Sequence, residues 1–120
     1  MCKETGRKTR VGYKERVEVC RPGEQFRREF AAKLDTGAHW NRIGKDLQER
    51  LKLPLSKRPG KVISFAKGHE FRNFVWARVR IAGRKIRTEF SVSKKPGVLL
   101  GRRTIGSRFV IDPGVKFVLG

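Results

Sequence analysis

The segment Ala32–Ala38 constrains this chain most, because an apolar stretch ends there in one carboxylate followed by a hydroxyl and a glycine. Asp35 can act as a general base on a water molecule, and Thr36 can hydrogen-bond across to a second copy of the turn. Gly37 permits backbone angles and a close approach that a Cβ atom would block. Chemistry that divides acid and base roles between two carboxylates needs two such turns. Since Asp-Thr-Gly occurs once in 120 residues, that chemistry would require a homodimer.

A second stretch, near the C-terminus, fits the first. Residues 97–105 indicate an apolar strand, a glycine turn and a short helical turn, and residues 109–112 indicate another strand. Asp-Thr-Gly-Ala together with Leu100-Gly101-Arg102 and Ile111-Asp112 resembles the retropepsin-like aspartic peptidases. The similarity is greatest to the bacterial and archaeal branch labelled ATP-dependent zinc proteases, and it covers roughly residues 17 to 117.

This resemblance implies a closed acid-protease barrel in which Asp35, Thr36 and Gly37 form the catalytic turn. It gives Arg102 a structural role, tying its own turn to the region near the acid. Three positions depart from the family pattern. Asn41 stands where the family usually has Ser or Thr, His39 stands where viral members often have an acid, and residues 64–69 hold one glycine where a glycine-rich flap is expected. The resemblance therefore indicates the fold more directly than the activity.

Short runs rich in Val, Ile and Phe, separated by Gly and Pro turns, indicate an all-β domain with one or two short helices. We divide the chain into a basic N-terminal arm, residues 1–16, expected to be disordered when free, and a single retropepsin-like β domain, residues 17–120. The strands expected before the C-terminal region are 17–20, 25–34, 62–65, 71–81 and 85–92. A turn at residues 112–114 should then precede a last apolar segment, residues 115–119.

One helix is expected after the Asp-Thr-Gly turn. Ile43, Leu47 and Leu51 recur at four-residue spacing, which predicts a short amphipathic helix that Pro54 closes. We expect these three side chains to belong to the core.

Residues 71–92 predict a long β-hairpin around a turn at Ala82-Gly83-Arg84. The first strand has Val75, Ala77, Val79 and Ile81 on one face and Arg72, Phe74, Trp76, Arg78 and Arg80 on the other. In the second strand, Ile86, Thr88, Phe90 and Val92 alternate with Lys85, Arg87, Glu89 and Ser91. The outer surface of the hairpin should therefore be mostly cationic, with aromatic side chains among the arginines.

The net charge of the chain points to a polyanionic partner. Lys and Arg number 30 against 11 Asp and Glu, which gives a formal charge of +19. Such an excess favours structured RNA, because cationic side chains contact phosphates and none of the common DNA-binding motifs occurs. The candidate RNA-binding residues are Lys3, Arg7, Lys8, Arg10, Lys14, Arg72, Trp76, Arg78, Arg80, Arg84, Lys85, Arg87, Arg103 and Arg108.

We expect no cofactor and no bound metal, because the two cysteines and two histidines lack metal-ligand spacing. Cys2 and Cys20 can pair, but two free thiols are the simpler interpretation. We also expect a cytoplasmic protein, since the sequence shows neither a membrane-length apolar run nor a signal peptide. Few amides and many charges are typical of a thermophilic source.

Two functions compete at this point. The interpretation that we favour from the sequence is an RNA-binding protein on a retropepsin-like scaffold. Its RNA would be ribosomal, with ribosomal proteins as neighbours, and Asp35 would cap its turn without chemistry. The alternative is a homodimeric aspartic endopeptidase whose catalytic dyad takes Asp35 from each chain.

Overall fold

The computed structural model of this chain describes residues 8–119. Within that range the chain forms the following elements: β1 (Thr9–Cys20), β2 (Glu29–Leu34), β3 (Asn41–Gly44), α1 (Lys45–Leu51), β4 (Lys61–Phe65), β5 (Gly68–Arg72), β6 (Phe74–Ile81), β7 (Arg84–Ser93), β8 (Val98–Leu100), α2 (Arg102–Ile105) and β9 (Phe109–Lys116). The chain is thus mostly β with two short helices in the described part, as the strand and turn pattern predicts.

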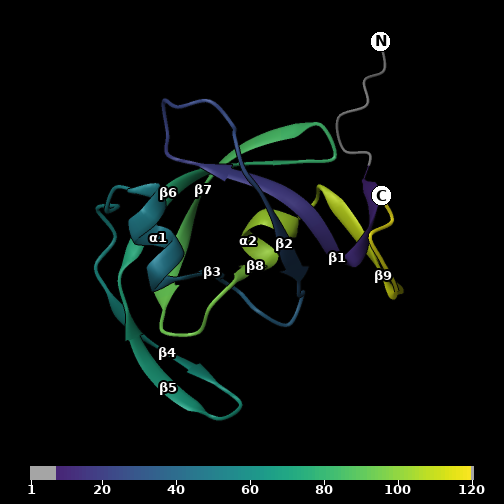
Figure 1. Cartoon of the computed structure of the whole chain (residues 1–120). Helices are drawn as coiled ribbons and strands as arrows, with labels where there is room; N and C mark the ends of the chain where they lie inside the picture. Colours follow the sequence, from purple (N-terminus) through teal and green to yellow (C-terminus); the bar gives the residue numbers. More distant parts are fainter. Residues whose placement is uncertain (1–7, 120) are drawn as a thin grey trace.

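Six strands close into a barrel in the order β2-β8-β3-β7-β6-β1, because β1 also pairs with β2. The seventh strand of this sheet, β9, continues it by pairing in parallel with the first half of β1. β4 and β5 form a separate two-stranded hairpin that projects away from the barrel (Figure 1). The expected closed retropepsin-like barrel is confirmed.

β1 is the strand on which the barrel closes, and it begins earlier than the sequence suggests. Residues 9–14 pair with β9, residues 14–18 with β2 and residues 18–20 with β6. The boundary at residue 17 is therefore wrong, since residues 9–16 belong to the sheet and not to an arm. The physical reason is burial. Glu15 is fully buried and its carboxylate accepts hydrogen bonds from the N–H groups of Gly12 and Leu119. The first seven residues lie outside the described part.

The β6–β7 hairpin forms as expected at its tip. Ala82 and Gly83 both have positive φ angles, 53° and 76°, which is the two-residue turn that suits the twist of a hairpin. Val75, Ala77, Val79 and Ile81 all face the core and are at most 2% exposed. The far end of the hairpin differs from the prediction.

The expected single strand over residues 71–81 breaks at Asn73. The backbone carbonyl of Asn73 accepts the Val92 N–H, while the segment from Pro54 to Ser56 runs beside the start of β6. There Ser56 N–H donates to Phe74 O and Trp76 N–H donates to Pro54 O. These contacts hold the first residues of β6, so Phe71 and Arg72 belong to β5 instead.

Smaller differences concern element ends. Ile43 lies in β3 and not in the helix, although Ile43 and Leu47 are buried and Leu51 packs against the core as predicted. β2 begins at Glu29, so the strand that precedes the acid is shorter than expected. Residues 112–114 form an irregularity within β9, whose register against β1 shifts between Gly12 and Lys14, and not a turn that ends the strand.

Gly101 marks a close crossing of two segments in the fold. A Cβ atom built there would lie 2.6 Å from Ala38 O and 2.7 Å from Trp40 O, both backbone atoms. Neither carbonyl can move without disturbing the segment that follows the Asp-Thr-Gly turn. Only glycine fits at this crossing.

Gly101→Ala should therefore destabilise the protein by about 1–3 kcal/mol, the usual cost of forcing an extra carbon into a close-packed site. Urea unfolding monitored by tryptophan fluorescence measures the change. Gly114→Ala is the matched control, because its Cβ would meet only Asp112 Oδ1, at 3.6 Å. Equal stabilities of the two variants would show that the crossing is not tight.

Candidate active site

The Asp-Thr-Gly turn begins where β2 ends and is held by the neighbouring strand. Leu34 pairs with Leu100 of β8, and the Asp35 N–H donates to Leu100 O at 3.0 Å. The Asp35 Oδ1 atom in turn accepts the Gly37 N–H at 2.8 Å. One carboxylate oxygen is thereby fixed by backbone, while Asp35 remains half-buried and Thr36 and Gly37 are exposed. A carboxylate held in this way is preorganised for chemistry on its open side.

Arg102 supports the Asp-Thr-Gly turn through hydrogen bonds to its backbone and to the residue that follows it. Its Nη1 atom donates to Thr36 O at 2.8 Å, and its backbone N–H donates to Ala38 O at 2.8 Å. The next residue, Arg103, donates its N–H to His39 O at 3.2 Å. The start of α2 is therefore bonded to the backbone that follows the acid. This is the structural role that the family resemblance implied for Arg102.

Asn41 explains one departure from the family pattern. Its side chain is fully buried, and its Oδ1 atom accepts the Gly101 N–H at 2.9 Å. Its Nδ2 atom donates to Glu89 O at 2.8 Å and to Thr88 Oγ1 at 3.1 Å. An amide supplies acceptor and donor from one side chain, whereas an alcohol has a single oxygen. Asn41 thus joins β3, β7 and the Gly101 crossing.

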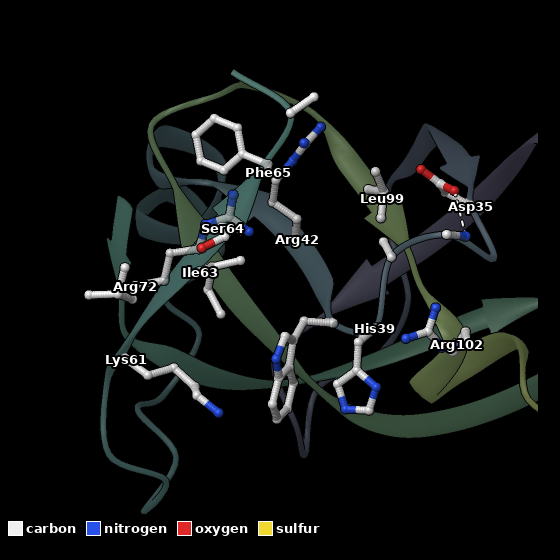
Figure 2. A pocket seen from close by; sticks show the side chains of 15 residues that line it. Asp35, His39, Arg42, Lys61, Ile63, Ser64, Phe65, Arg72, Leu99 and Arg102 are labelled. Atoms are coloured by element: carbon white, nitrogen blue, oxygen red, sulfur yellow. Dashed lines mark hydrogen bonds between the residues drawn. The ribbon is translucent and has the colours of Figure 1, made fainter. Parts of the chain in front are cut away.

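A cleft of about 570 Å³ opens beside Asp35. One end is lined by the Asp-Thr-Gly turn, and the wall opposite is lined by residues 61–66 of the β4–β5 hairpin (Figure 2). Phe65 pairs with Gly68 across the hairpin tip, and Gly68 has a φ angle of +149°. The two strands of this hairpin pair although residues 64–69 hold a single glycine. One glycine at the tip is enough, because the two-stranded pairing holds the remaining residues.

The cleft is strongly cationic. Arg42, Lys61, Arg72 and Arg102 line it, and Asp35 is the one carboxylate among the lining residues. Figure 2 shows Arg42 in the middle of the lining, with Asp35 and Arg102 on one side of it and the β4 residues on the other. The cleft therefore combines a fixed carboxylate with an excess of positive charge.

Arg72 is buried at the base of the hairpin and is 5% exposed. Its Nε atom donates to Glu70 Oε1 at 2.7 Å, and its Nη1 atom donates to Ser91 Oγ at 3.1 Å. Glu70 also accepts the Ser93 hydroxyl and the Lys94 N–H. The placement of Arg72 on the solvated outer face of the hairpin is therefore wrong. Because the strand breaks at Asn73, Arg72 turns inward to anchor the hairpin.

Phe74, Glu89 and Ser91, placed on the outer face by strict alternation, are also buried. Glu89 accepts hydrogen bonds from Arg58 through both carboxylate oxygens, at 2.9 to 3.3 Å. Burial raises the pKa of Glu89, but the hydrogen bonds from Arg58 and Ser56 and the charges of Arg58 and Arg103 outweigh it and leave the pKa lowered. The segment around Arg58 covers this end of the hairpin, so its outer face is not solvated there.

The other predicted RNA contacts are spread over several elements. Lys3 and Arg7 lie outside the described residues, Lys8 and Arg10 are exposed, and Lys14 is half-buried in β1. Arg10 pairs with Asp112 and Arg80 pairs with Glu18. Arg78 and Arg80 both lie over the Phe26 ring, and Arg87 lies over Trp76. Arg84 donates a hydrogen bond to Thr9, and Arg103 lies over the Trp40 ring. Arg108 donates to Thr104 O, and Lys85 is exposed. Their contact with RNA stays a prediction.

Within residues 8–119, no group of three or more His, Cys, Asp or Glu side chains comes together where a metal could bind. His39 and His69 are both exposed. Cys20 is a buried free thiol whose pKa is raised chiefly by burial, and its possible partner Cys2 lies outside the described part. In the same range, no helix is long and apolar enough to cross a membrane.

Sequence reasoning missed Arg42, Lys61 and Phe65 as cleft residues. For Arg42 a signal was present, because it stands between Asn41 and Ile43, whose side chains both point inward. Alternation along a strand therefore sends Arg42 to the opposite face. Lys61 and Phe65 depend on where the hairpin lies relative to the barrel, which the sequence pattern does not encode.

The lowered pKa of Glu70 predicts how the stability of the protein depends on pH. Burial raises its pKa, but the hydrogen bonds from Ser93, Lys94 and Arg72 outweigh burial and lower the pKa from 4.5 to about 2. Since the folded state has the lower pKa, ionised Glu70 stabilises the fold fully above pH 4.5, and this contribution is lost as the pH falls to about 2. Glu70→Gln should lower the melting temperature at pH 7, and the gap to the unmodified protein should close between about pH 4.5 and 2.

Thermal unfolding followed by circular dichroism across this pH range measures the gap. Glu49→Gln, which removes an exposed carboxylate on α1, is the matched control and should show no such closing gap. A Glu70→Gln gap of constant size down to pH 2 would rule out the proposed linkage.

Comparison with known proteins gives matches at the level of structure. No family model matches the chain, and no curated protein does. Among solved structures, EIAV protease in complex with an inhibitor is similar with a TM-score of 0.62 and 21% identity, covering 88% of this chain and 91% of its own. The protease of simian foamy virus has a TM-score of 0.52 and 19% identity, covering 75% and 88%. A Legionella pneumophila protein of unknown function has a TM-score of 0.61 and 16% identity, covering 92% and 98%. The chain therefore has the retropepsin-like fold of these proteins.

Proposed function

We propose that this protein is an aspartic endopeptidase that works as a homodimer, with Asp35 of each chain forming the catalytic dyad. One observation carries the proposal. The Asp35 carboxylate, fixed by the Gly37 N–H, stands at one end of a cleft whose opposite wall is a two-stranded hairpin. The similarity to two viral proteases supports it further. This proposal takes precedence over the RNA-binding function that the sequence favoured, because the charge alone supports the latter.

In the proposed reaction the two Asp35 side chains share one proton. The ionised carboxylate takes a proton from a water molecule, whose oxygen attacks the scissile carbonyl carbon, while the protonated carboxyl gives its proton to the carbonyl oxygen. The resulting intermediate collapses as the C–N bond breaks and the leaving nitrogen receives a proton. Thr36 and Gly37 are exposed in the single chain, so this turn is open to a second copy.

Asp35→Asn should lower kcat/KM for a peptide library by about 100- to 10,000-fold, the usual contribution of a general acid or base. The rate of the unmodified protein should depend on pH as a bell, because one carboxyl must be ionised and the other protonated. Asp46→Asn, which removes an exposed carboxylate on α1, is the control and should retain activity.

The mass of the particle in solution is the second measurement. Light scattering after gel filtration should give twice the chain mass of 13.8 kDa under conditions where cleavage occurs. Cleavage by a strictly monomeric protein, or full activity of Asp35→Asn, would refute the proposed dyad.

RNA binding is a second proposal, supported by the net charge of +19 and by exposed Lys85 and Arg87. Phosphate contacts make such binding salt-dependent. Sedimentation of a cell lysate at low salt, with and without nuclease, tests it. A nuclease-sensitive shift to heavy fractions is expected, and recovery of all the protein in light fractions without nuclease would exclude it.

A further inference from the structure

Arg42 stands apart from the other cations of the cleft. Its side chain is half-buried, and its Nε atom is buried without a hydrogen-bond partner in the described part of the chain. A buried donor left unpaired is costly, because it has lost water and gained nothing in exchange. Because Arg42 also lines the cleft, an anion bound there can compensate the charge of this incompletely paired guanidinium.

The backbone holds Arg42 rigidly in this place. Its strand, β3, pairs with β7 on one side and with β8 on the other, where Arg42 is opposite Ser91 and Leu99. Asn41 and Ile43 on either side are fully buried, so alternation directs Arg42 out of the barrel and into the cleft. A guanidinium on a doubly paired strand is a positioned group and not a loose surface charge.

The remaining cations of the cleft already have partners. Arg72 is neutralised by Glu70 at its base, and Arg102 donates to Thr36 O. Lys61 lies over the Trp40 ring, with its Nζ atom 5.3 Å from the centroid. Arg42 forms no ion pair among the described residues. It is thus the cation that an incoming anion can pair with at least rearrangement.

The surroundings of Arg42 also favour an anion. Burial and the positive charge of Arg72 lower the pKa of Arg42, while the carboxylates of Glu70 and Asp35 act in the opposite direction. Glu70 already accepts hydrogen bonds from Arg72, Ser93 and Lys94, so its negative charge is largely compensated and does little to neutralise Arg42. An additional carboxylate beside Arg42 would offset both the desolvation and the repulsion from Arg72.

From these observations we infer that the cleft selects peptides with an acidic side chain close to the scissile bond, and that Arg42 binds the carboxylate of that side chain. The inference rests on the proposed peptidase function and names its substrate class. A planar guanidinium suits a carboxylate because two parallel N–H donors match its two oxygens. The positive potential of the whole chain would draw the same acidic segments towards the cleft.

The first test compares pairs of peptides that differ only by Glu or Gln at one position near the cleaved bond. A series of such pairs places the Glu or Gln at each position around that bond in turn. At one position, the unmodified protein should cleave the Glu peptide about 10- to 100-fold better in kcat/KM, the usual value of a charge-assisted hydrogen bond. Equal rates for Glu and Gln at every position would overturn the inference. This comparison needs no variant, so it does not depend on a variant folding.

The second test assigns the preference to Arg42. Arg42→Gln should bring the Glu to Gln ratio close to one, and Arg42→Glu should reverse it in favour of a Lys peptide. Lys61→Gln removes a charge from the same cleft and should retain most of the Glu to Gln ratio. Arg87→Gln removes a charge outside the cleft lining and is the second control. An unchanged ratio in a folded Arg42→Gln protein would contradict the inference, as would an equal loss in Lys61→Gln.

A binding measurement separates this inference from the peptidase proposal. The Asp35→Asn protein should bind the Glu peptide about 10- to 100-fold more tightly than the Gln peptide, followed through the fluorescence of Trp40 in the cleft. Selective binding without any cleavage by the unmodified protein would refute the peptidase and support the subsite. Cleavage without Glu selectivity would refute the subsite alone, and the absence of both would refute the two together.

Discussion

The rest of the site depends on one constraint, the close crossing of Gly101 with the segment that follows Asp35. The glycine passes within contact distance of the carbonyls of Ala38 and Trp40, and its N–H donates to the Asn41 side chain. Since Asn41 also bonds to β7, one buried amide links three elements that are distant in sequence. With this crossing fixed, Arg102 necessarily lies below the turn, where it bonds to Thr36 O. The position of the Asp35 carboxylate thus follows from backbone packing.

Several buried or half-buried carboxylates in residues 8–119 are paired with arginines, and this pairing limits the positive charge that is free in the cleft. Glu89 is held by Arg58, Glu70 by Arg72, and Glu18 by Arg80. A buried ion pair is tolerated when its remaining hydrogen-bonding capacity is also filled, as it is for Glu70. Each pair removes one arginine from the set that can meet a ligand. The large excess of Arg and Lys over Asp and Glu therefore overstates the charge that is available at any one site.

Much of the barrel was predictable from the sequence, because alternation and turn chemistry act locally. Val75, Ala77 and Val79 follow the period of a strand, and Ala82-Gly83 is a tight hairpin turn. Predictions that need non-local information were wrong. The break at Asn73 depends on the chain near Ser56 lying beside β6, and the burial of Arg72 follows from that break. At the site, the turn could be identified from its residues, whereas the opposite wall of the cleft could not.

Local charge, and not the net charge of the chain, decides whether so basic a protein can form the proposed symmetric dimer. Repulsion between two copies grows with the net charge, but it is screened by salt beyond about 8 Å at physiological ionic strength. What matters at the proposed dyad is therefore the local charge near Asp35, where Arg102 is bonded to the turn itself. Two Asp35 carboxylates brought together between two such arginines would meet compensating positive charge, and an acidic peptide in each half of the cleft would add more negative charge beside Arg42. A substrate of this class would thus reduce the opposition to pairing, so that binding and association would favour one another.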